Sequence, residues 1–205
     1  MIVNKIKKIV DALLSPSDQH LQGMQNIRTD EANLEFEQAQ CFEQLAIEHH
    51  LTCDNDQSSY NNRNAIWNFL SAALKGHSDA QYKLGVCYLH GQLGLDKNYP
   101  HAEEWLTKAA KQDNSDAQYK LGVCYLHGQL GLDKNYTHAE EWLTKAAKQD
   151  HSDAQYKLGI CYLHGQSGLD KNYTHAEEWL KKAAKQGHRE AQMTLEKAYS
   201  QLAFS

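Results

Sequence analysis

The sequence predicts an all-α fold, an α-solenoid built from helix–turn–helix repeats (an α/α superhelix). A 37-residue segment that begins at Ser78 returns almost unchanged at Ser115 and again at Ser152. Each copy contains two stretches with apolar residues at helical spacing, and glycines separate the two stretches. The 205 residues include only two prolines, so helices meet few interruptions. Because a repeat of this length cannot bury its own apolar face, neighbouring copies must share a core.

Residues 1–29 are predicted to form an N-terminal amphipathic helix and a connector. The helix should end near Ser15 and Pro16, since proline disfavours helix in the residue before it. We expect this helix to dock on the body of the protein; a membrane-surface or partner-binding helix is the alternative. Its apolar residues at helical spacing are Ile2, Ile6, Ile9, Val10 and Leu13.

Residues 30–76 are predicted to be a diverged first repeat with a longer internal loop. We expect one helix over residues 30–51, with Thr29 as its N-cap, and a second helix from Asn61 to Lys75. Gly76 is a suitable C-cap for the second helix. The segment aligns with the later repeats through three alanines, because Ala65, Ala72 and Ala73 lie 37 residues before Ala102, Ala109 and Ala110.

Residues 77–187 contain three near-identical 37-residue repeats, each with a helix A, a loop and a helix B. In the first copy, Ser78 is the predicted N-cap of helix A, Gly91 ends that helix, and Asn98 caps helix B. Pro100 falls in the first turn of helix B, where a missing N–H is tolerated. Residues 188–205 repeat only helix A, and we expect them to form a C-terminal capping helix.

The repeat closely resembles the Sel-one-like repeat (SLR), a relative of the tetratricopeptide repeat. The resemblance covers the three full repeats, extends weakly to residues 30–76, and includes residues 188–205 as half a unit. It implies a right-handed α-solenoid and a role as an adaptor in protein complexes. The family commonly has Asp at the position of Asn98, and both residues can cap a helix. The shared pattern is Ala80-x3-Leu84-Gly85-x2-Tyr88-x2-Gly91-x2-Gly94-Leu95-x2-Asn98-x3-Ala102-x2-Trp105-x3-Ala109-Ala110.

Composition argues against several classes of function. The net charge is −5 with acidic and basic residues interspersed, whereas nucleic-acid binding requires a concentrated basic face. No stretch approaches the roughly 20 apolar residues that span a bilayer, so we expect no membrane insertion. Cys87, Cys124 and Cys161 occupy the same place in successive repeats, one per repeat. Unpaired cysteines favour free thiols in a reducing compartment, and we expect a cytoplasmic protein.

Catalytic, cofactor and metal sites are not expected. Cys87 and His90 are one helical turn apart, but structural zinc usually has four ligands and neighbouring repeats are on the order of 10 Å apart. The adjacent Glu103 and Glu104 point in different directions and form no acid–base pair. We therefore predict that the protein is not an enzyme. The alternative is a β-lactam-interacting enzyme, because some secreted, cysteine-rich relatives of the resembling family bind or hydrolyse β-lactams.

The candidate binding surface is the exposed side of helix A, which lines the concave face in the resembling tetratricopeptide architecture. Aromatic, aliphatic and basic residues recur there in register and could hold a peptide or a partner's helix. Two alternatives stay open: Asp79 and Lys83 form only an i,i+4 pair, or Tyr82 packs between repeats. The candidate residues are Tyr82, Lys83, Val86, His90, Tyr119, Lys120, Val123, His127, Tyr156, Lys157, Ile160 and His164.

The sequence therefore predicts a protein–protein interaction scaffold whose partner is another protein or a peptide. The alternative within this class is an immunity or inhibitor protein against a bacterial toxin or effector. The oligomeric state is left open, with a monomer favoured.

Overall fold

A computed structural model describes residues 18–51, 55–129, 131, 133–165 and 171–203, and all regular structure in these ranges is α-helical. The helix predicted near the N-terminus, up to Ser15, lies outside the described residues. No helix in these ranges has both the length and the apolar character to cross a membrane. The chain divides into two compact units, residues 1–97 and 98–205.

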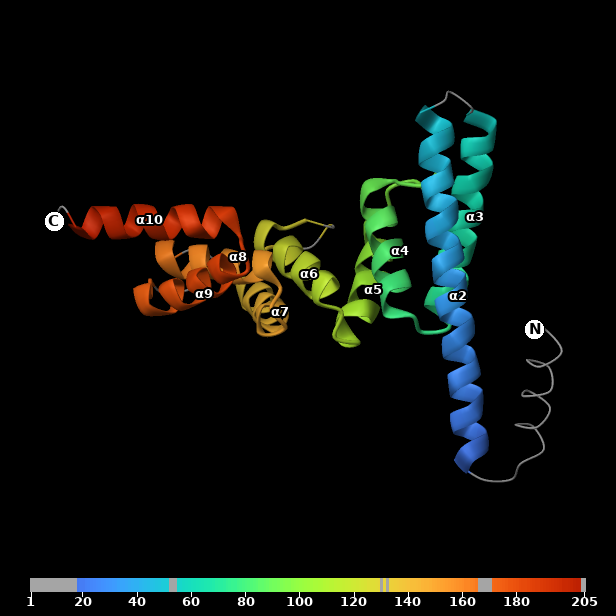
Figure 1. Ribbon diagram of the computed structural model, residues 1–205, viewed down its shortest axis with the longest axis horizontal. Helices are drawn as coiled ribbons and strands as arrows, with labels where there is room; N and C mark the ends of the chain where they lie inside the picture. Colours follow the sequence, from blue (N-terminus) through green and yellow to red (C-terminus); the bar gives the residue numbers. More distant parts are fainter. Residues whose placement is uncertain (1–17, 52–54, 130, 132, 166–170, 204–205) are drawn as a thin grey trace. The chain divides into compact units, whose positions relative to one another are not determined.

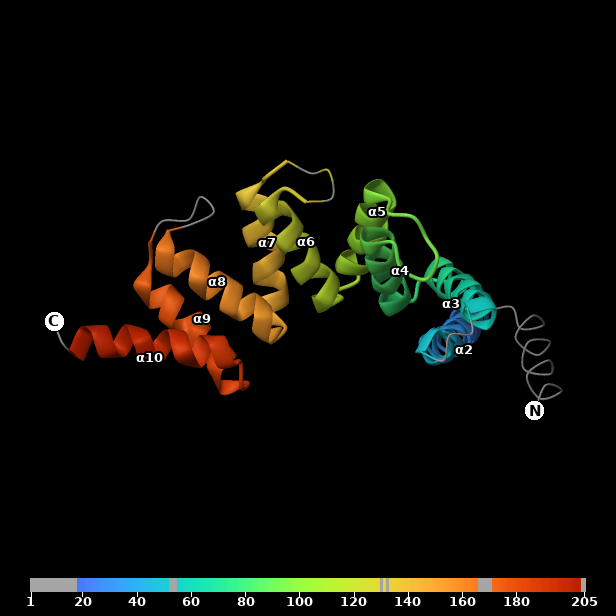
Figure 2. The same cartoon turned by 90° about the horizontal axis from the view of Figure 1, so that it is seen from above.

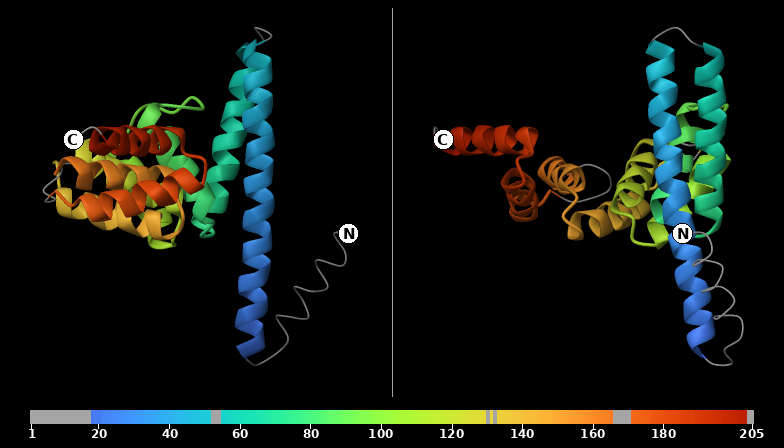
Figure 3. Two further views of the ribbon diagram at one scale, coloured as in Figure 1. Left: turned by 60° about the vertical axis from the view of Figure 1, so that its left-hand side comes forward. Right: turned by 45° about the vertical axis from the view of Figure 1, so that its right-hand side comes forward.

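The first unit contains three described helices, α2 (Asp18–Leu51), α3 (Asn55–Leu74) and α4 (Ser78–His90). Helices α2 and α3 lie side by side and antiparallel, and α2 extends well beyond the end of α3 (Figures 1 and 3). The guanidinium of Arg28 donates to the carbonyl of Leu74 at 3.1 Å, which marks where α3 ends along α2. Helix α4 then packs against α3.

The predicted starts of α2 and α3 are wrong. Helix α2 runs without a break through Thr29, which is not an N-cap; its hydroxyl donates to the carbonyl of Gln25 at 2.9 Å. A threonine hydroxyl inside a helix commonly bonds the carbonyl four residues back. Helix α3 starts at Asn55, six residues before the predicted Asn61. Its polar first turns are held against α2, since the hydroxyl of the buried Ser58 donates to the carbonyl of Ala46 at 3.0 Å.

The second unit is a run of helices in which each packs on the next along the chain. Figure 2 shows α6 beside α7 and α8 beside α9. Consecutive packed helix pairs confirm the predicted α-solenoid fold class. Helices α6 and α8 are helix A of their repeats, α5, α7 and α9 are helix B, and α10 is the predicted capping helix. Their bounds are α5 (Tyr99–Lys111), α6 (Ser115–His127), α7 (Tyr136–Lys148), α8 (Ser152–His164), α9 (Tyr173–Lys185) and α10 (Arg189–Ala203).

Side-chain caps fix the ends of the repeat helices. The prediction for helix B is confirmed, because Asn98 Oδ1 accepts from the backbone N–H of His101 at 3.1 Å. The predicted end of helix A is also confirmed, since Gly91 has a left-handed φ of 69°. Ser78 is not the N-cap of α4 but its first residue. The N-cap is His77, whose Nδ1 accepts from the N–H of Ala80 at 3.3 Å.

Helix A and helix B of a repeat approach each other at a glycine. A Cβ on Gly122 would lie 2.7 Å from Cγ of Leu143, and a Cβ on Gly159 would lie 2.7 Å from Cγ of Leu180. Leu143 is only 1% exposed, so it has no free space into which to move. The corresponding position of α10 is the exposed Glu196, 37 residues after Gly159. Helix α10 therefore offers no such contact site.

The first prediction concerns this contact. Gly122→Ala should lower the free energy of unfolding, because overpacking costs about 1–3 kcal/mol. The gain in helix propensity, about 1 kcal/mol, offsets only part of that loss. Chemical denaturation followed by circular dichroism measures the difference.

Glu196→Ala is the matched control at the same repeat position, and its effect should stay within about 0.5 kcal/mol. Removing the obstructing side chain in a Gly122→Ala, Leu143→Ala double variant should make the two losses non-additive. A Gly122→Ala protein as stable as wild type would show that the helices are free to move apart.

The second prediction concerns the pH dependence of the His77 cap. The ring of His77 stacks on Phe36 of α2, with centroids 4.4 Å apart, and burial, only partly opposed by Asp79, lowers the pKa of His77. The unfolded chain has a histidine pKa of about 6.5 and therefore binds more protons than the folded chain as the pH falls below that value. Stability should consequently decrease from about pH 7 towards about pH 5.

His77→Asn should reduce this decrease and keep the cap, because Asn114 already caps α6 by accepting from the N–H of Ala117 at 2.9 Å. Denaturation curves of the two proteins across this pH range measure the effect. Equal slopes in both would show that His77 titrates alike in the folded and unfolded states.

Candidate functional site

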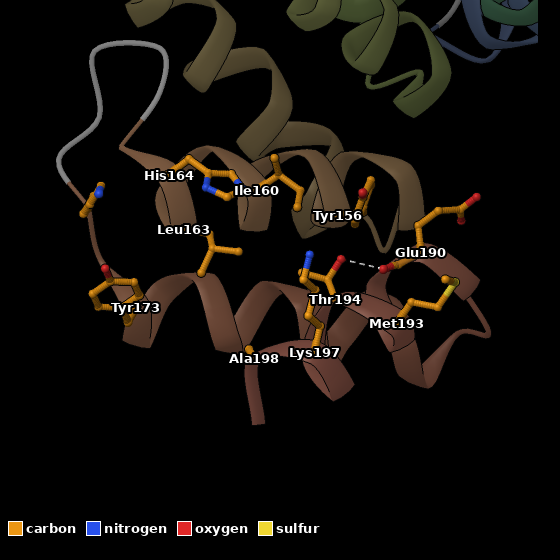
Figure 4. Close-up of a pocket in the computed structure, with 11 residues that line it drawn as sticks. Tyr156, Ile160, Leu163, His164, Tyr173, Glu190, Met193, Thr194, Lys197 and Ala198 are labelled. Atoms are coloured by element: carbon orange, nitrogen blue, oxygen red, sulfur yellow. Dashed lines mark hydrogen bonds between the residues drawn. The ribbon is translucent and has the colours of Figure 1, made fainter. Parts of the chain in front are cut away.

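A groove of about 670 Å³ lies between α8 and α10 in the second unit (Figure 4). Tyr156, Ile160 and His164 line it from α8; they are four residues apart and therefore share one side of the helix. In Figure 4, His164 and Tyr173 lie near one end of the groove, and Glu190 and Met193 lie near the other. Further lining residues, among them Leu163, Lys171, Thr194, Lys197 and Ala198, complete its walls.

The groove brings together three of the four residues that the sequence predicted on α8. Lys157, the fourth, is not among the lining residues. The sequence prediction missed the contribution of α10, where Met193 and Lys197 hold the repeat positions of Tyr156 and Ile160. The 37-residue offset would have placed both residues on the same face as their counterparts.

Two of the predicted tyrosines, Tyr119 and Tyr156, pack between consecutive repeats. Tyr119 stacks on His151 with ring centroids 4.7 Å apart, and Tyr156 stacks on His188 at 4.5 Å. Burial, followed by the charge of Asp153, raises the pKa of Tyr119. Each tyrosine thus joins its helix to the N-cap of the next helix A, because His151 and His188 hold that position. This is the packing role that the sequence left open for Tyr82.

Other predicted residues also have contacts within the protein. The ammonium of Lys83 lies 3.1 Å from a carboxylate oxygen of Glu43, which links α4 to α2. Val123 packs against the core cluster around Leu143 and Leu158. Of the remaining predicted residues, Tyr82, Val86 and Lys120 are half-buried and His90 is exposed, as the burial of each helix A shows.

Basic side chains gather near the end of helix A. The pKa of His127 is lowered mainly by burial, and the positive charges of Lys157 and Lys134 lower it further. Lys157 is on α8, and Lys134 belongs to the connection between α6 and α7. The prediction from sequence missed Lys134 and its counterpart Lys171. Their recurrence in the loop sequence Asp-Lys-Asn-Tyr, with the period of the repeat, was the available signal.

The repeated cysteines are buried free thiols. Burial is the main cause that raises the pKa of Cys87 to about 12 and that of Cys124 to about 11. Such thiols stay protonated at neutral pH, whereas metal binding and nucleophilic attack require the thiolate. Across the described ranges, no three His, Cys, Asp or Glu side chains are grouped so that they could hold a metal ion. Cys161 is also buried, and Cys41 on α2 is exposed.

Comparisons with known proteins agree with this architecture. Residues 78–114, 115–151 and 152–188 each match the model of the Sel1 repeat. A protective antigen of uropathogenic Escherichia coli with an SLR fold is 29% identical, with a TM-score of 0.72 over 83% of this chain. The match covers 34% of the antigen, so this chain spans about a third of its length.

A Sel1 repeat protein from Oxalobacter formigenes is 36% identical, with a TM-score of 0.60; the match covers 64% of this chain and 97% of that protein. No curated protein matches the sequence.

The third prediction concerns the thiols. At about pH 8, Cys41 should react quickly with a maleimide, whereas Cys87 and Cys124 should react only after unfolding because they are buried and protonated. Tandem mass spectrometry after proteolysis measures the rate at each site. Cys87 and Cys124 lie in tryptic peptides of identical sequence, so mass spectrometry measures the two thiols together. The measurement is still informative, because both thiols should be protected from the maleimide.

Cys41→Ser is the control and should remove the reaction assigned to Cys41. Labelling of the shared peptide at the rate of Cys41 in folded protein would contradict the burial of the repeat thiols.

Proposed function

We propose that this chain, which belongs to the Sel1 repeat family, is a non-enzymatic scaffold that binds a peptide or a partner protein through its helix A face. In the second unit the helix A face comprises the exposed side of α6 and α8 and the same side of α10; in the first unit it comprises the exposed side of α4. The groove between α8 and α10 is the observation that carries this proposal. Sel1 repeats generally mediate protein–protein interaction, which supports the same conclusion.

The groove has the chemical character of a protein-binding surface. Ile160 and Leu163 are half-buried on its α8 side, and Met193 on α10 is 57% exposed. Tyr173, at one end, is 65% exposed. A partner that covered these side chains would remove apolar area from water. The basic side chains that also line the groove, His164, Lys171 and Lys197, would keep polar contacts with it. An extended peptide or an amphipathic helix fits a groove of this kind.

The other predicted residues of the helix A face belong to the same proposal. On α6 these are Tyr119, Lys120, Val123 and His127, and on α4 they are Tyr82, Lys83, Val86 and His90. Because Tyr119 and Val123 also pack inside the protein, their loss would reduce stability as well as binding. Residues of α10 with high exposure are therefore better probes of binding.

The buried, protonated repeat thiols support a non-enzymatic role, since they offer no thiolate nucleophile. Reduced thiols also support a cytoplasmic location. We propose a monomer that uses the helix A face for a partner other than itself.

The fourth prediction tests the groove. Met193→Asp should weaken capture of the protein's partner from extracts of its native host, because a carboxylate would replace an apolar contact inside the groove. A central interface side chain commonly contributes about 1–2 kcal/mol, equivalent to roughly a fivefold to thirtyfold loss of affinity. The thermal unfolding curve should not change, since Met193 is exposed.

Glu178→Lys, at an exposed position of α9, is the matched control and should leave capture unchanged. The partner is identified by mass spectrometry of protein retained by wild type and absent from the Met193→Asp sample. If the control abolishes capture and Met193→Asp does not, the partner binds the helix B side and the proposed face is wrong.

A further inference from the structure

The helix A face carries a group of three basic side chains at each of two junctions in the second unit. At the first junction, His127 ends α6, Lys134 lies in the loop that follows it, and Lys157 is on α8; the charges of both lysines act on the imidazole. At the second junction, His164, Lys171 and Lys197 line the groove between α8 and α10. The histidines and the loop lysines are 37 residues apart in sequence, so the two groups recur with the repeat.

Asp116, Asp153 and Glu190 lie in the first turns of α6, α8 and α10, at the opposite end of these helices from His127 and His164, and each lies near a histidine of the protein. His151 Nε2 lies 3.2 Å from Asp116, and His188 Nε2 lies 3.1 Å from Asp153. Glu190, which lines the groove, lies 3.3 Å from Nδ1 of His188. Figure 4 shows His164 near one end of the groove and Glu190 near the other.

The basic groups have no such partners. Within the described part of the chain, no ion pair joins Lys134, Lys157 or Lys171 to a carboxylate. Asp133 precedes Lys134, and the carbonyls at the C-terminal end of α6 add about half a negative charge; the charges of Lys134 and Lys157 together exceed this. Because the whole chain has a net charge of −5, these groups are local exceptions.

We propose that the helix A face binds an acidic peptide segment of a partner protein that also carries apolar side chains. This inference rests on the function proposed above and adds the chemical class of the ligand. Carboxylates of the peptide would meet the lysines of the two groups, and its apolar side chains would lie on Ile160, Leu163 and Met193. Charge complementarity supplies specificity and a faster association rate, while the apolar contacts supply most of the affinity.

A nucleic acid fits the same surface less well. Its phosphates form a continuous line of negative charge and require a continuous basic stripe. Here Glu190 lies near one end of the groove and His164 near the other, the apolar side chains of Ile160 and Leu163 lie between them, and Lys197 lies beside Thr194. A peptide with acidic residues at one end and apolar residues along the remainder matches this order of charge and apolar surface.

The test uses the full chain and a fluorescent peptide of about ten residues, with several Glu at one end followed by Leu and Phe. At roughly 3.3 Å per residue it covers the length of α8, which is about 20 Å. Fluorescence polarisation should show saturable binding that weakens as salt is added. A peptide with Gln in place of every Glu should bind less tightly.

Lys134→Gln with Lys171→Gln should reduce affinity for the acidic peptide by about threefold to tenfold, as expected for the loss of two ion pairs. Lys148→Gln with Lys185→Gln is the matched control. It removes the same charge from exposed positions 37 residues apart at the ends of α7 and α9, and it should leave affinity unchanged.

Four results would overturn the inference: no saturable binding of the acidic peptide, equal affinity for the Gln peptide, equal losses in the two double variants, or tighter binding of a single-stranded oligonucleotide. Failure of the inference is distinguishable from failure of the proposed function. If Met193→Asp abolishes capture of the partner while the lysine variants bind normally, the groove is a binding site and only the ligand class is wrong.

Discussion

The close approach of helix A to helix B at Gly122 and Gly159 is the constraint on which the rest of the repeat depends. It brings the backbone of one helix against Leu143 or Leu180 of the other, so the two helices have a single packed arrangement. One side of helix A is thereby committed to helix B. On its other side, Tyr156, Ile160, Leu163 and His164 are left to line the groove.

The stacked tyrosine and histidine rings connect this arrangement to the next repeat. His151 performs three tasks, since it caps α8, stacks on Tyr119 and contacts Asp116. A single side chain therefore couples the start of one helix to the side of the preceding helix A. At the same position before α6, Asn114 caps the helix through its amide oxygen, so the cap itself does not require an aromatic ring.

The repeat fold was predictable because its signals are local. Asn98 and Gly91 fix the ends of helices within a few residues of their own position. The 37-residue period of the sequence then predicts the same helix ends in the other repeats. The start of α3 at Asn55 was not predictable, because a contact between Ser58 and Ala46 in another helix overrides the polar local sequence. The candidate site was predicted in part: Tyr156, Ile160 and His164 share the groove. The stacking of Tyr119 on His151 joins residues 32 positions apart, and no local pattern reveals it.

The contrast between Gly159 and Glu196 has a consequence for how this array can change in length. Helices α6 and α8 present nearly the same sequence to their neighbours, so an in-frame gain or loss of 37 residues between them would recreate the same helix contacts. Helix α10, which has the exposed Glu196 at the repeat position of Gly159, could stay packed on the preceding helix B at any copy number. A change in the number of repeats would therefore lengthen or shorten the binding surface, and every new contact between helices would be of a kind already present.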